Sequence, residues 1–181
     1  MLPDWSVGHV ITHIARNADS HERILRAASQ GQVVEQYEGG GVARSADIEA
    51  GACRGAAELV ADVVASCALL QQAWSETSEV GWKGHGIMPN SGLVRCNDLP
   101  FRRWREGLVH LHDCGLGYSW RDWPDDYVRL ELARMTMEWA SRKPMGLTTL
   151  PAVAVALTDH ERVAWLLGRT VVEGLDPAGI F

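Results

Sequence analysis

Residues Phe101 to Pro124 read FRRWREGLVHLHDCGLGYSWRDWP, and this stretch guides the fold prediction because it contains a helix together with its ends. Asn97 or Asp98 is placed to cap the helix, and Pro100 lies near its first turn, where proline lacks only an N–H that has no helical partner. Gly115 follows the last apolar position and is typical of a residue that ends a helix. The stretch therefore predicts a helix that runs to about residue 114, followed by a tryptophan-rich connection.

The same helix carries an acidic and a basic side chain one turn apart. Glu106 and His110 are four residues apart, which places both side chains on one helical face. A carboxylate and an imidazole in this arrangement can ligate one metal ion, and the simpler alternative is a surface hydrogen bond between them. His13 lies at the edge of the apolar stripe of the first predicted helix and can meet the pair across a bundle. Together the three residues predict a metal site with one open coordination position, as in catalytic zinc sites.

Other polar or reactive side chains near these positions are interpreted more simply. His21 falls near the middle of the apolar stripe and is expected in the core, whereas His9 falls nearer to solvent. His112 is two residues from His110, so it points away from the same metal and can at most support a ligand or line the pocket. Asp113 can orient a ligating histidine, or it is simply a polar residue at a helix end. Cys114 is expected to be a small buried residue rather than a nucleophile.

Apolar periodicity and helix-breaking residues predict an all-α protein with long loops. Residues 29–46, which include the triplet Gly39 to Gly41, are expected to form a flexible loop. Residues 75–98 are expected to form a long connection with a short hairpin around Asn90-Ser91-Gly92. A break at residues 143–146 separates a helical bundle, residues 1–143, from a C-terminal extension, residues 144–181. Further helices are predicted over residues 4–28, 47–74, 124–141 and 158–168.

The composition argues against several classes of protein. The 17 basic and 23 acidic residues give a net charge of −6, which disfavours a nucleic-acid partner but permits an anionic small molecule. The sequence has no run of 18 apolar residues, so no membrane span is expected. Asp4 and His9 lie where a signal peptide would be basic or apolar. The protein is interpreted as cytoplasmic, with its four cysteines as free thiols, and a homo-oligomer remains open.

Three segments of the sequence are similar to the motifs of a known protein family. The segments are LPDWSVGHVITHIARNADS (residues 2–20), RRWREGLVHLHDCGLGYSWRDWP (residues 102–124) and ERVAWLLGRTVVEGLDPAG (residues 161–179). They resemble, in the same order, the motifs of the mycothiol-dependent maleylpyruvate isomerases, and the similarity covers most of the chain. The resemblance implies a DinB-like four-helix bundle with a short C-terminal α or α+β extension.

The resemblance also implies which residues form the site. The metal histidine of the family corresponds to His13, and its Glu-x-x-x-His pair corresponds to Glu106 and His110. The implied metal is a divalent cation, usually zinc. A catalytic arginine in the C-terminal part corresponds to Arg169. The alternative for Arg169 is a cation at a helix C-terminus, where it interacts favourably with the helix dipole.

The implied chemistry uses a thiol that the protein does not supply. The open position takes the thiol of mycothiol, and the charge of the metal lowers the thiol pKa. The thiolate adds to the double bond of maleylpyruvate, the resulting single bond rotates, and elimination gives fumarylpyruvate. The expected partners are therefore a low-molecular-weight thiol and an anionic or electrophilic small molecule. The alternatives are a mycothiol S-transferase acting on another electrophile, a non-catalytic metal-stabilised binding bundle, and a truncated inactive copy.

The sequence also differs from the family pattern. Family members carry a further helix before the Leu-Pro-x-Trp motif, whereas this sequence begins at that motif. A bundle without that helix would expose an apolar face for a neighbouring chain to cover, and a truncated reading frame is the alternative. Gly107 lies between two predicted ligands, where a helical glycine costs up to about 1 kcal/mol. These differences bear on the substrate more than on the metal site.

Overall fold

Helices account for most of the computed structural model, which describes residues 2, 4–89, 91–143 and 148–179 and confirms the expected all-α class. The chain divides into two compact units, residues 1–115 and 116–181. The predicted boundary between residues 143 and 144 adjoins a segment outside the described residues, and it stays a prediction.

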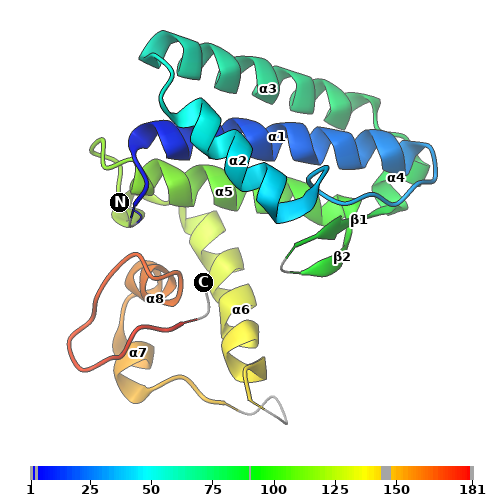
Figure 1. Cartoon of the computed structure of the whole chain (residues 1–181). Coiled ribbons are helices and arrows are strands. Elements are labelled where there is room, and N and C mark those ends of the chain that lie inside the picture. Colours follow the sequence, from blue (N-terminus) through cyan, green and yellow to red (C-terminus); the bar gives the residue numbers. More distant parts are fainter. Residues whose placement is uncertain (1, 3, 90, 144–147, 180–181) are drawn as a thin grey trace. The chain divides into compact units, whose positions relative to one another are not determined.

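The first unit is organised around one long helix. Helix α1 (Val7–Ser29) contacts α2 (Gly40–Ala52), α3 (Ala56–Glu76), α4 (Glu79–Lys83) and α5 (Leu99–Asp113). Figure 1 shows α1 lying between α3 and α5, with α2 crossing it. Because α1 touches every other helix of this unit, its side chains can meet groups that are far away in the sequence.

The start of α1 is fixed by a reciprocal cap. Ser6 Oγ accepts the backbone N–H of His9 at 3.4 Å, and His9 Nδ1 accepts the backbone N–H of Ser6 at 3.1 Å. This cap satisfies two helix-end donors and leaves Trp5 just outside the helix. The helix predicted over residues 4–28 is thus confirmed, with its start at Val7. Its apolar face is buried through Val10, Ala15, Ala18, Ile24, Leu25 and Ala28.

The prediction for residues 29–74 is wrong in one respect. A single helix over residues 47–74 was expected after a flexible loop, but α2 begins at Gly40, and a break separates it from α3. Gly39 and Gly40 have φ angles of 77° and 69°, so the glycine triplet forms the turn into α2. At Gly51 an added Cβ would lie 2.5 Å from Thr12 Cγ2, so the absent side chain lets α2 cross close to α1.

A two-stranded hairpin closes one end of the first unit. Strand β1 (His85–Met88) pairs antiparallel with β2 (Gly92–Arg95), and Met88 is opposite Gly92. This confirms the predicted hairpin, although Asn90 lies outside the described residues. The strands help to bury a core contributed by Ala18, Ile24, Leu25, Ala28, Leu70, Ala73, Met88, Val94, Cys96 and Leu99.

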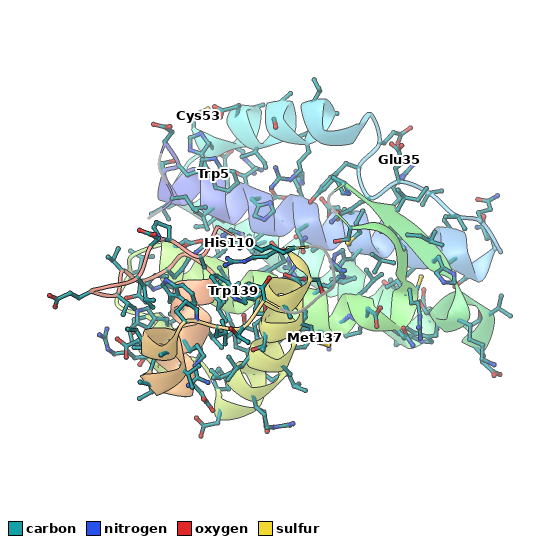
Figure 2. All side chains as sticks on the ribbon, turned by 90° about the horizontal axis from the view of Figure 1, so that it is seen from below. Trp5, Glu35, Cys53, His110, Met137 and Trp139 are labelled. Atoms are coloured by element: carbon teal, nitrogen blue, oxygen red, sulfur yellow. The ribbon has the colours of Figure 1, made fainter. Side chains whose placement is uncertain are left out.

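The second unit contains α6 (Asp125–Ser141), α7 (Ala152–Ala156) and α8 (Asp159–Leu166). Thr158 Oγ1 accepts the backbone N–H of Glu161 at 3.3 Å, which caps α8, so the helix predicted over residues 158–168 is present. Trp139, labelled in Figure 2, packs against Trp165 with ring centroids 5.1 Å apart. Helix α7 was not predicted because five residues give no periodicity to detect.

One face of the first unit is apolar and exposed. Val60 and Val64 of α3 are 57% and 62% exposed. Beside α3, a groove of about 800 Å³ is lined by Trp74, Pro100, Phe101, Arg103, Trp104, Gly107, Leu108 and Leu111.

Among the described helices, α3 alone is long and apolar enough to cross a membrane, judged by length and composition. A single helix of this kind is weak evidence for a membrane span. Asp62 of α3 is ion-paired with Arg16 at 2.6 Å and Arg54 at 2.7 Å, so polar contacts also hold α3 in the bundle.

Candidate metal centre

The three residues predicted as metal ligands meet inside the first unit. His13 comes from α1, and Glu106 and His110 come from adjacent turns of α5. Their donor atoms all lie within 4.8 Å of one another. Glu106 Oε2 is 2.9 Å from His13 Nε2 and 3.3 Å from His110 Nε2. The i, i+4 spacing on α5 and the position of His13 at the edge of the apolar stripe of α1 therefore bring both histidines close to one carboxylate oxygen of Glu106.

This donor set fits a divalent metal ion. Two ligand atoms that each lie about 2.05 Å from a tetrahedral metal are separated by about 3.3 Å. Glu106 Oε2 lies at this distance from His110 Nε2, whereas its 2.9 Å distance from His13 Nε2 is shorter and corresponds to a hydrogen bond. Two imidazoles and one carboxylate are also the donors of many catalytic zinc sites, which keep a further position open. His13 and His110 are buried, and the side chain of Glu106 is 18% exposed. The cluster is thus largely shielded from solvent, and Glu106 keeps it partly accessible.

The protonation states of two of the three residues already suit a metal. Burial lowers the pKa of His13, and its contacts with Glu106 only partly oppose this effect. Burial alone would raise the pKa of Glu106, but hydrogen bonds with His110 and His13 hold it well below the usual range. At neutral pH, His13 is therefore neutral and Glu106 is ionised, as metal ligation requires.

His110 is held by a second carboxylate. Asp113 is buried, and its Oδ2 lies 2.9 Å from His110 Nδ1. Burial lowers the pKa of His110, but hydrogen bonds with Asp113 and Glu106 outweigh this effect and raise the pKa overall. Because Asp113 holds a proton on Nδ1, a metal ion would displace only the proton that Nε2 shares with Glu106 and would take the Nε2 lone pair, the arrangement usual for a ligating histidine.

Sequence reasoning did not single out two residues at this site. Trp5 precedes α1, and its ring centroid is 5.6 Å from that of His13. The rings of Trp5 and His110, both labelled in Figure 2, stack with centroids 6.4 Å apart and planes 19° apart. Arg44 of α2 places a guanidinium nitrogen 3.1 Å from His13 Nδ1. Trp5 is the tryptophan of the first family motif, so that motif could have identified it as a site residue. No sequence pattern identified Arg44.

The remaining candidates lie where their simpler interpretations place them. His9 pairs with Glu49 of α2 at 3.3 Å, and His21 is 1% exposed in the core. Cys114 is buried, and burial together with the nearby Asp113 raises the pKa of its thiol, which disfavours a nucleophilic thiolate. His112 is half-buried and does not belong to the donor cluster.

Arg169 belongs to the second unit and lies just beyond α8. Its backbone N–H donates to the carbonyl of Ala164 at 2.7 Å, and its guanidinium donates to the carbonyl of Leu167 at 2.6 Å. These bonds satisfy carbonyl groups at the end of the helix, as expected for a cation at that position. Its predicted catalytic role is untested by these contacts and stays a proposal.

Comparison with known proteins gives the family of the chain. Residues 1–115 match the family described as the mycothiol maleylpyruvate isomerase N-terminal domain. The match covers more than half of the sequence, and the chain belongs to this family. No curated protein matches the sequence significantly.

Two solved structures share the fold. The first, the crystal structure of a mycothiol-dependent maleylpyruvate isomerase, superposes with a TM-score of 0.81 at 24% identity, covering 93% of this chain and 76% of that one. The second, a single-substitution mutant of a mycothiol-dependent maleylpyruvate isomerase, gives a TM-score of 0.80 at 23% identity, with the same coverage. At this identity the likeness establishes the fold, and this confirms the architecture that the sequence motifs implied.

Gly107, which lies between the two ligands of α5, provides a test of local helix stability. An added Cβ at Gly107 would meet no atom within 4 Å, and α5 is helical there. We expect Gly107→Ala to raise the free energy of unfolding by about 0.5–1 kcal/mol, because alanine has the higher helix propensity. Urea unfolding measures this change. Gly8→Ala is the matched control and should destabilise, because its Cβ would collide with the carbonyl of Ala52. A destabilised Gly107→Ala variant would contradict the prediction.

His21 is expected to make the protein sensitive to acid. Complete burial lowers the pKa of His21 to about 3, an effect that Glu106 opposes and that Arg103 and Arg102 reinforce. In the unfolded chain the same imidazole titrates near pH 6.5. Below pH 6.5 the unfolded state therefore binds a proton that the folded state does not, and the free energy of unfolding falls as the pH falls.

Replacing His21 with methionine should remove this contribution. Between pH 7.5 and pH 5 the wild type should lose about 2 kcal/mol more of its unfolding free energy than His21→Met. Methionine has a similar volume and leaves no buried imidazole nitrogen, whereas Nδ1 of His21 has no hydrogen-bond partner among the described residues. Urea midpoints measured across this pH range provide the test. Equal losses in the two proteins would show that His21 is not the acid-sensitive group.

Proposed function

We propose that this protein is a divalent-metal-dependent and mycothiol-dependent isomerase of the maleylpyruvate type. The convergence of His13, Glu106 and His110 in a chain of this family is the observation that carries the proposal. The fold is also that of a solved mycothiol-dependent maleylpyruvate isomerase. Family and donor set therefore point to the same class of chemistry.

In this proposal the three donors hold a zinc ion or a similar divalent cation. Glu106 contributes the negative charge, and the two histidines contribute neutral nitrogen donors from different helices. Asp113 fixes the ring of His110 through its bond to Nδ1. A bound Zn²⁺ would lower the pKa of a coordinated thiol, so that the thiolate is available at neutral pH. Trp5 contacts both imidazole rings, edge-on at His13 and stacked on His110.

The proposed reaction needs no oxidant and no nucleophile from the protein. The thiolate sulfur of mycothiol forms a bond to one carbon of the substrate's cis double bond, and the displaced electron pair moves onto the conjugated carbonyl oxygen. The new single bond rotates, and the C–S bond then breaks as the double bond re-forms in the trans geometry. The thiol is returned unchanged. Arg169 is proposed to bind a substrate carboxylate and to stabilise the transient enolate charge.

A turnover assay tests this proposal. Zinc-loaded protein is mixed with maleylpyruvate, with and without mycothiol, and the formation of fumarylpyruvate is followed. We expect conversion only when both metal and mycothiol are present, with mycothiol recovered intact. Conversion that does not depend on mycothiol, or a metal-loaded protein with no turnover, would overturn the proposal. Accumulation of a stable mycothiol thioether with another electrophile would instead identify an S-transferase.

A further inference from the structure

Arg44 occupies a position that a ligating histidine normally reserves for a hydrogen-bond acceptor. A guanidinium nitrogen of Arg44 lies 3.1 Å from Nδ1 of His13, on the ring edge opposite Glu106. A metal-ligating histidine usually donates its second N–H to a carboxylate or a carbonyl, as His110 does to Asp113. A guanidinium has five N–H donors and no acceptor. His13 and His110 thus have opposite kinds of neighbour at the same ring position.

This contact suits the metal-free protein and conflicts with the metal-bound one. Without a metal, Nδ1 of His13 accepts a bond from Arg44 while Nε2–H donates to Glu106. To offer its Nε2 lone pair to a metal, neutral His13 must carry its proton on Nδ1. That N–H would then face an N–H of Arg44, two donors with no acceptor between them. Arg44 must therefore leave His13 when His13 becomes a ligand.

The surroundings of Arg44 allow this movement and leave a cation beside the site. The guanidinium lies 5.6 Å from the ring centroid of Tyr37, and no carboxylate among the described residues is paired with Arg44. By contrast, Arg16 and Arg54 both bind Asp62. The start of α2 has no side-chain cap, and only Ile48 and Gly51 of this helix are buried. The side chain can therefore rotate without breaking an ion pair or a packed core.

We infer that Arg44 releases His13 when the metal ion binds and then holds a carboxylate of the anionic substrate beside that ion. The inference rests on the proposed metal-dependent function and adds a substrate-binding residue to it. A divalent ion and Arg44 outweigh the charges of Glu106 and Asp113, so the loaded site keeps a net positive charge that favours an anion. The planar guanidinium can bind both oxygens of one carboxylate.

The first test measures metal affinity without substrate. Arg44→Gln offers Nδ1–H of His13 an acceptor oxygen and removes the like charge. It should therefore bind Zn²⁺ more tightly than the wild type, by about tenfold. Asp113→Asn is the opposed control and should bind Zn²⁺ about tenfold more weakly, because it disturbs the orientation of His110. Competition with a chromophoric chelator gives both affinities, and circular dichroism checks that the variants are folded.

The second test uses a stable dicarboxylate as the probe. Succinate is titrated into the Co²⁺-loaded protein, and the visible absorption of Co²⁺ reports anion binding near the ion. We expect Arg44→Gln to bind succinate at least about tenfold more weakly than the wild type, Arg44→Lys to retain part of the affinity, and uncharged succinamide not to bind. Arg26→Gln is the control, because residue 26 lies 13 positions and about 20 Å along α1 from His13.

The outcomes separate this inference from the proposed function. If Arg44→Gln lost Zn²⁺ affinity, or if it bound succinate as tightly as the wild type, the role of Arg44 would be refuted even if maleylpyruvate turnover persisted. If succinate binding depended on Arg44 but no turnover occurred, the carboxylate site would stand and the isomerase assignment would fail. A wild-type protein that bound no Co²⁺ would overturn both.

Discussion

Glu106→Gln is expected to weaken divalent-metal binding by more than about a hundredfold, because the loss of a ligand should exceed the 10- to 100-fold effect of changing a supporting residue. Glutamine keeps the size of the side chain but removes the charge that faces both histidines. Glu106 Oε2 lies 2.9 Å from His13 Nε2 and 3.3 Å from His110 Nε2, so this one carboxylate is common to both contacts. Isothermal titration with Zn²⁺ at neutral pH measures the change. His13→Ala should show a comparable loss.

Glu49→Gln is the matched control for this experiment. Glu49 also pairs with a histidine of α1, since its Oε2 lies 3.3 Å from His9 Nε2. However, this pair has no second histidine, and its carboxylate is 71% exposed. The Glu49→Gln variant should therefore bind metal like the wild type. Equal affinity of Glu106→Gln and the wild type would show that the donor cluster does not hold the ion.

Arg103→Met is expected to lower the free energy of unfolding by about 2–3 kcal/mol, since it removes charge-assisted hydrogen bonds to partly buried partners. Arg103 of α5 donates to the carbonyl of Ile14 at 2.8 Å and to Asn17 Oδ1 at 2.9 Å, both on α1. Its other guanidinium nitrogen lies 3.2 Å from Cys67 Sγ of α3. One side chain therefore joins three helices, and methionine can replace its apolar stem but none of its donors.

Urea unfolding followed by circular dichroism measures the effect of Arg103→Met. Arg102→Met is the control at the neighbouring position, where the guanidinium donates a long, exposed bond of 3.3 Å to Ser91 Oγ. The control should change the unfolding free energy by less than about 1 kcal/mol, as is usual for exposed polar contacts. Similar losses in both variants would show that the contacts of Arg103 with α1 and α3 contribute little.

The sequence predicted those features whose causes are local. Residues near 98 and 115 place the ends of α5 correctly because Pro100 in the first turn and Gly115 after the last act within one helical turn, whereas the predicted cap is wrong, since Asp98 makes no side-chain capping bond. The break between α2 and α3 escaped prediction although its signal is local, since Gly55 precedes α3 and its backbone N–H donates to Glu58 Oε2 at 3.2 Å. The close crossing of α2 over α1 at Gly51 and Thr12 is by contrast a tertiary contact that no local pattern encodes.

The candidate site also contains residues that the sequence could identify and one that it could not. Glu106 and His110 could be recognised by their spacing, and His13 by its place on the apolar stripe, because helical geometry relates these positions to a face. Arg44 could not be recognised, since it lies 31 positions from His13 in a segment expected to be a loop. Helical periodicity gives no information about a side chain that approaches from outside the helix.

The distribution of the donors along the chain has a thermodynamic consequence. His13 and Glu106 are 93 positions apart, so an ion held by both would close a loop that includes α2, α3 and the hairpin. Because the unfolded chain does not preserve this cluster, metal binding would add to the stability of the first unit by mass action. At a free metal concentration of one hundred times the dissociation constant, the gain is about 2.7 kcal/mol. The thermal midpoint of this unit should therefore rise with free metal concentration, and the fraction that is folded should depend on the metal supply.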